Sequence, residues 1–107
     1  LINGSCNITG GGLVENIPRV LPKNVTAKID LAKIKVKKIF SWIQKNGVEE
    51  KEMLRTFNCG VGFVLFAKKE NLQKISKIFP LLYKPYVIGE VVSKTSSKIE
   101  FEGNVNF

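Results

Sequence analysis

A run of three glycines, Gly10 to Gly12, constrains the fold of this chain more than any other feature of its sequence. Glycine loses more backbone freedom on folding than any other residue, so such a run is expected where the backbone must turn sharply or approach another group. The run leads into a helix-compatible segment, residues 13–20. The glycine N–H groups would then lie at the positive end of a helix, which favours an anion. A flexible turn without a ligand is the alternative, and no Walker or dinucleotide-binding spacing is present.

The two arginines are conspicuous because the remaining 15 of the 17 basic residues are lysines. Arg19 lies in one distinctive segment, residues 16–19, and Arg55 lies in another, residues 54–58. A guanidinium can hold an anion with two parallel hydrogen bonds, which lysine cannot do. Chance placement or a structural ion pair is an equally good interpretation.

Length and charge set the class of protein. The 107 residues suit one small domain, and the net charge is +8. The lysines are scattered, with one dense group at residues 33–38, so the charge does not predict nucleic-acid binding. No apolar run is long enough for a membrane span. Asn-x-Ser/Thr triplets begin at Asn3, Asn7 and Asn24, but triplets arise easily in an asparagine-rich chain. We therefore expect a cytoplasmic protein with free thiols.

Histidine is absent, and the only cysteines are Cys6 and Cys59. This excludes a Ser-His or Cys-His nucleophile pair within the chain, a histidine general base and a zinc site. The acids at residues 49–52 could be metal ligands, but they suit the first turn of a helix better. We predict no metal site.

Hydrophobic periodicity predicts an α-β-α-α-β-α-β-β order, hence an α/β or α+β sandwich with helices packed on a mixed sheet. The alternation at Val25–Asp30 and around Ile99 predicts half-buried strands. The apolar run after Gly60 predicts a central strand covered on both faces. Trp42 is expected in the core or at an interface. The predicted helices cover residues 13–20, 36–45, 49–54 and 70–82, and the strands cover 25–30, 61–66, 86–92 and 99–101.

Two long blocks in the correct order give the chain a specific resemblance. Asn-Ile-Thr-Gly-Gly-Gly-Leu-Val-Glu-Asn-Ile-Pro-Arg at 7–19 and Glu-Met-Leu-Arg-Thr-Phe-Asn-Cys-Gly-Val-Gly at 52–62 resemble motifs of the phosphoribosylformylglycinamidine cyclo-ligases, or aminoimidazole ribonucleotide synthetases. Ile43-Gln44 and Ile-Gly-Glu-Val at 88–91 also match. The resemblance spans nearly the whole chain.

The resemblance implies an ATP-dependent ligase of purine biosynthesis. Such an enzyme closes the imidazole ring of formylglycinamidine ribonucleotide, with ATP and Mg²⁺, and releases ADP and phosphate. It implies that residues 1–107 are the C-terminal portion of the C-terminal domain, that an N-terminal ATP-binding domain is missing, and that the full-length protein is a homodimer. Another member of the same ATP-dependent superfamily, or a non-catalytic basic binding module, is the alternative.

The resemblance and the helix-end argument predict the same site. Substrate or phosphate binding is predicted for Asn7, Thr9, Gly10, Gly11, Gly12, Asn16 and Arg19. Arg55, Thr56 and Asn58 are predicted to line the same cleft or to brace the glycine loop. No catalytic residue is predicted. Asn7 stands where the family usually has histidine, and an amide can hydrogen-bond but cannot shuttle a proton near neutral pH.

Overall fold

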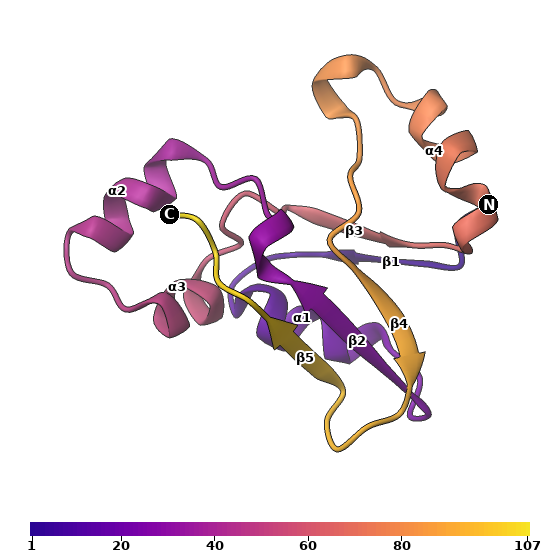
Figure 1. Ribbon diagram of the computed structural model, residues 1–107, viewed down its shortest axis with the longest axis horizontal. Coiled ribbons are helices and arrows are strands. Elements are labelled where there is room, and N and C mark those ends of the chain that lie inside the picture. Colours follow the sequence, from indigo (N-terminus) through magenta and orange to yellow (C-terminus); the bar gives the residue numbers. More distant parts are fainter.

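The computed structural model describes all residues, 1–107, and Figure 1 shows two small sheets joined by short helices. The predicted mixed α/β architecture is confirmed. The elements, with η for a 3₁₀ helix, are β1 (Gly4–Asn7), α1 (Gly12–Val20), β2 (Val25–Asp30), η1 (Leu31–Lys33), α2 (Lys38–Lys45), α3 (Glu50–Thr56), β3 (Phe63–Phe66), η2 (Lys69–Asn71), α4 (Leu72–Ile78), η3 (Leu81–Tyr83), β4 (Gly89–Ser93) and β5 (Ile99–Glu102). Strand β1 was not predicted, because its four residues carry no apolar alternation.

The central strand of the larger sheet is β2. It pairs antiparallel with β4 and parallel with β5, in the order β4-β2-β5. Ala27 and Ile29 are buried, as the alternation predicted. Thr26, expected on the polar face, is buried too. Its hydroxyl donates to the Ser97 carbonyl at 2.6 Å and accepts from the Thr95 N–H at 3.0 Å, so it ties the β4–β5 connection to β2.

The smaller sheet corrects one prediction. Strand β3 is not a central strand covered on both faces, because it pairs only with β1, in a two-stranded antiparallel sheet. Phe63 on β3 is 59% exposed, and residues 64–66 are half-buried. An apolar run does not by itself distinguish a strand that its own chain covers on both faces from one with an open face.

The predicted helix 70–82 is also shorter than expected. A 3₁₀ turn precedes α4, which ends at Ile78. Phe79 is extended, with φ −87° and ψ 139°, because Pro80 disfavours helical backbone in the residue before it. The predicted strand 86–92 begins only at Gly89.

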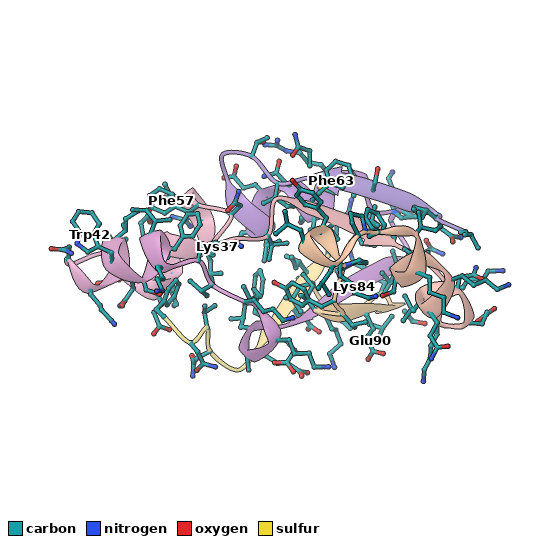
Figure 2. All side chains as sticks on the ribbon, turned by 90° about the horizontal axis from the view of Figure 1, so that it is seen from above. Lys37, Trp42, Phe57, Phe63, Lys84 and Glu90 are labelled. Atoms are coloured by element: carbon teal, nitrogen blue, oxygen red, sulfur yellow. The ribbon has the colours of Figure 1, made fainter.

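The core surrounds α1, which contacts β1, α3 and β5 and so joins the two sheets. Leu13 and Ile17 of α1 and Met53 of α3 are at most 1% exposed. Burial of such side chains stabilises a fold by about 1.5–3 kcal/mol each. Trp42 is not in this core: it is 64% exposed and points outward from α2 (Figure 2). The core therefore fixes the start of α1 against the end of α3.

Candidate functional site

The triple glycine does form the start of a helix. Gly11 and Gly12 have φ values of 98° and 61°, in the left-handed region that side chains disfavour. Helix α1 has no side-chain cap, and the Gly12 N–H donates to the Thr9 carbonyl at 3.0 Å. The backbone N–H groups of Thr9, Gly10 and Gly11 have no hydrogen-bond partner within the chain. Three consecutive free amides at a helix start are suited to binding an anion.

The third glycine, Gly12, allows a close contact between α1 and α3. A Cβ on Gly12 would collide with the Leu54 carbonyl oxygen and lie 2.7 Å from the Phe57 carbonyl oxygen. Helix α1 therefore starts directly on the last turn of α3 and the residue after it. This contact joins the two sequence blocks, since Gly12 and Leu54 lie more than forty residues apart in the sequence. A Cβ on Gly10, in contrast, would meet no atom within 4 Å.

Asn16 supports the same loop from inside. Its side chain is buried, and its amide donates to the carbonyl oxygens of Thr9, Gly10 and Gly12 at 3.2, 3.3 and 2.8 Å. Its Oδ1 lies 3.4 Å from the Thr9 hydroxyl, which donates to it. By satisfying these carbonyl groups, Asn16 holds the loop in its observed shape. The direct anion contact predicted for Asn16 stays a prediction.

Arg19 lies away from the loop. It is seven residues beyond Gly12 in α1, about 10 Å along the helix axis. Its guanidinium is 3.7 Å from the Glu15 carboxylate, and the side chains are 66% and 50% exposed. Such an exposed pair adds little stability. Asn7, at the end of β1, is exposed and pairs with Phe63 across the sheet. Neither side chain lines the cavity beside the glycine loop.

An open cavity of about 340 Å³ brings the two sequence blocks together. Thr9 and Gly10 form one side of it, and Thr56 and Asn58 form another. The Thr56 hydroxyl donates to the Glu52 carboxylate at 2.8 Å. The Asn58 Oδ1 accepts the Gly60 N–H at 2.8 Å, and its amide NH₂ donates to no group of the chain. Asn58 therefore turns the backbone with one end of its side chain and presents donors with the other.

An aromatic pair completes the cavity. The rings of Phe40 and Phe57 lie 6.0 Å apart, tilted by 55°. Figure 2 shows Phe57 against α2, the helix that carries Phe40. Phe40 lies in the helix predicted over residues 36–45, and Phe57 lies in the family block at 52–62. The spacing of Phe40 along its helix gave no signal that it lines a cavity.

Arg55 belongs to a different surface. It lines a second cavity, of about 400 Å³, which residues of α1, α3 and β5 share. That cavity also contains Glu49, Lys51 and Glu52 from the acidic start of α3, with Phe101 of β5. The structure thus brings Thr56 and Asn58 to the glycine loop and places Arg55 elsewhere.

Both thiols are free, buried and protonated near neutral pH. Burial raises the pKa of Cys59 to about 11, and its Sγ donates to the Met53 carbonyl at 3.5 Å. Burial also raises the pKa of Cys6, against a smaller lowering effect of Arg19. The Cys6 Sγ donates to the Asn16 carbonyl at 3.2 Å. Since the thiolate is the reactive form, both cysteines act in packing rather than as nucleophiles.

No three His, Cys, Asp or Glu side chains come together in the structure. The free loop amides fit a phosphate group. None of the helices combines the length and the apolar character that crossing a lipid bilayer requires.

Comparison with known proteins identifies the family. Residues 1–102 match the family described as AIR synthase related protein, C-terminal domain. The chain is also 42% identical over 107 residues to a phosphoribosylformylglycinamidine cyclo-ligase of Bacillus cytotoxicus. That match covers 98% of this chain and 30% of the relative, so the chain spans about a third of the relative's length. The chain therefore belongs to the family described as AIR synthase related protein, C-terminal domain.

Proposed function

We propose that this chain supplies the C-terminal part of a phosphoribosylformylglycinamidine cyclo-ligase, residues 1–107 being the C-terminal portion of that enzyme's second domain. The whole enzyme would close the imidazole ring of formylglycinamidine ribonucleotide in purine biosynthesis, in the cytoplasm and as a homodimer. The observation that carries the proposal is the cavity in which both family blocks meet, beside three free loop amides. The 42% identity to a cyclo-ligase supports it.

In this reaction, this part of the enzyme would bind a phosphate group and orient the bound molecule. ATP, when bound, supplies the phosphoryl group that activates the formyl oxygen before the neighbouring nitrogen attacks. A phosphate is stabilised by preorganised N–H donors that need not reorganise during the reaction. In our proposal the N–H groups of Thr9, Gly10 and Gly11 hold such a phosphate, and the free amide of Asn58 orients the bound molecule. Mg²⁺ would be held by residues outside this chain.

The cavity lining also limits what this chain contributes. Its side chains belong to Ile8, Thr9, Phe40, Thr56, Phe57 and Asn58, none of which titrates near neutral pH. General acid or base catalysis would therefore come from another part of the enzyme. Phe40 and Phe57 give the cavity an apolar wall that excludes water from one side of a bound molecule.

A chimeric enzyme tests the proposal. The 107 residues replace the matched region of the Bacillus cytotoxicus cyclo-ligase, and turnover of formylglycinamidine ribonucleotide is followed together with ADP release. We expect ATP-dependent ring closure with one ADP per product, and no activity from the 107-residue chain alone. A matched chimera with Asn58→Leu should lose turnover, while Asn106→Leu, at an exposed position away from the cavity, should keep it. A folded chimera without ATP-dependent turnover would reject the proposal.

A further inference from the structure

A contiguous apolar segment of this protein is exposed to solvent. We call residues 72–83, which include α4 and η3, the apolar arm. Ile78 is 67% exposed, Leu81 88%, Leu82 82% and Tyr83 70%. Figure 1 shows the arm rising away from both sheets. Scattered exposed apolar residues are normal on a protein surface, but a contiguous group marks an interaction site.

The arm is barely packed on the rest of the chain. Apart from the adjoining turn η2, α4 makes few contacts with any other element. Ile75 is the one buried side chain of α4, and it is not part of the main core. The exposed residues therefore face away from the protein's own core rather than filling it.

The sheet from which the arm departs is incomplete as well. Strands β1 and β3 pair only with each other, so each has an edge without a strand partner. Two-stranded sheets are marginal in water unless a further strand or a packed surface supports them. Phe63 on β3 and Ile2, just before β1, are exposed by 59% and 47%. The open sheet and the arm that follows it in the chain are therefore both uncovered, and we treat them as one region.

The length of the relative and the charge of the arm indicate what covers this region. The chain spans only 30% of the Bacillus cytotoxicus cyclo-ligase, so such an enzyme has a large additional part that can pack here. Residues 68–84 carry five lysines and one glutamate, so a covering surface would be apolar at its centre and acidic at its rim. We propose that the apolar arm is a docking surface for the N-terminal part of the cyclo-ligase. This inference rests on the proposed function.

Cysteine labelling measures whether the arm becomes covered. Leu82→Cys places a thiol on the arm, and Trp42→Cys places a control thiol on α2, where the side chain is 64% exposed. The native Cys6 and Cys59 are buried and react slowly. Each variant is alkylated both in the 107-residue chain and in the chimera, whose remaining cysteines are replaced. We expect Leu82→Cys to react about tenfold or more slowly in the chimera, because the docked surface must open first, while Trp42→Cys is unchanged.

Equal alkylation rates for Leu82→Cys in both proteins would overturn the proposal. Protection in the 107-residue chain that grows with its concentration would overturn it too, since a second copy would then cover the arm. As a second measurement, Leu82→Glu should lower the unfolding midpoint of the chimera but not of the chain alone, and no change in either would count against docking. A chimera that protects the arm but closes no ring would reject the proposed function and keep the docking surface.

Discussion

The glycine loop and the apolar arm contrast in how this chain uses its residues. At the loop, polar and small residues are packed tightly: Asn16 is buried against three carbonyl groups, and Gly12 touches the backbone of α3. In the arm, large apolar residues stay in water, with Leu81 and Leu82 more than 80% exposed. Residue type alone would have assigned the loop to the surface and the arm to the core.

The difference shows which part of the structure is packed by residues of this chain and which part is not. The start of α1 and the end of α3 contact each other within this chain. The arm and the open sheet have no such partner. Substitutions at the loop should therefore change the stability of the 107-residue chain by itself, whereas substitutions in the arm should change stability only in the chimera.

Gly12→Ala should have the largest effect. The new Cβ would collide with the Leu54 carbonyl oxygen, and the backbone would have to keep a φ of 61°. We expect a loss of about 3 kcal/mol or more in the free energy of unfolding, measured with urea. Gly10→Ala is the matched control, since its Cβ would meet no atom within 4 Å. Equal stability of the two variants would show that α1 does not start on α3 as described.

A rise in pH should have the next largest effect on the free energy of unfolding, through the buried thiol of Cys59. The thiol of Cys59 has its ordinary pKa of 9.0 in the unfolded chain and a pKa of about 11 in the folded chain. Between these values the unfolded state binds fewer protons, so the free energy of unfolding should fall by about 2–3 kcal/mol as the pH rises. The stabilisation that the buried Cys59 thiol contributes is fully present below pH 9. Cys59→Ala should remove this part of the pH dependence, measured by urea unfolding from about pH 8 to about pH 11. An unchanged profile would contradict the burial of Cys59.

Asn16→Ala should have a smaller effect. It removes the amide that satisfies the carbonyl groups of Thr9, Gly10 and Gly12, which we expect to lower the free energy of unfolding by about 1–2 kcal/mol. Hydrogen exchange of the Gly12 amide should accelerate, because its bond to Thr9 depends on the same loop. Asn106→Ala, at an exposed position, should change neither quantity. An unchanged exchange rate of the Gly12 amide in Asn16→Ala would show that Asn16 does not hold the loop in its shape.

The sequence predicted the features that depend on residues close together in the chain, and it did not predict those that depend on distant residues. The helix at 13–20, the strand at 25–30 and the glycine loop at a helix start were predicted, because each depends on local spacing. The contact of Gly12 with α3 and the place of Phe40 in the cavity were not, because both depend on residues that only the fold brings close. Asn16 was predicted to face a ligand, yet the same amide chemistry satisfies backbone carbonyls. The helix 70–82 was overextended because its apolar spacing continues through Pro80.

The smallest effect is expected in the arm. The double variant Leu81→Ser/Leu82→Ser should change the free energy of unfolding of the 107-residue chain by less than about 0.5 kcal/mol, because both side chains are already in water. Leu13→Ala, at a 1% exposed position of α1, should cost about 3 kcal/mol under the same conditions. A large loss from the double variant would mean that the arm packs on its own chain.

The most direct test of the central claim is an amide titration by nuclear magnetic resonance. The ¹⁵N-labelled chain is titrated with ATP and, separately, with inorganic phosphate, at constant ionic strength. We predict saturable shifts of the Thr9, Gly10 and Gly11 amides, with Gly12 and the lysine-rich segment 33–38 changing little. Saturation that leaves these three amides unmoved, or shifts confined to the lysines, would contradict the assignment of the glycine loop as the anion-binding element.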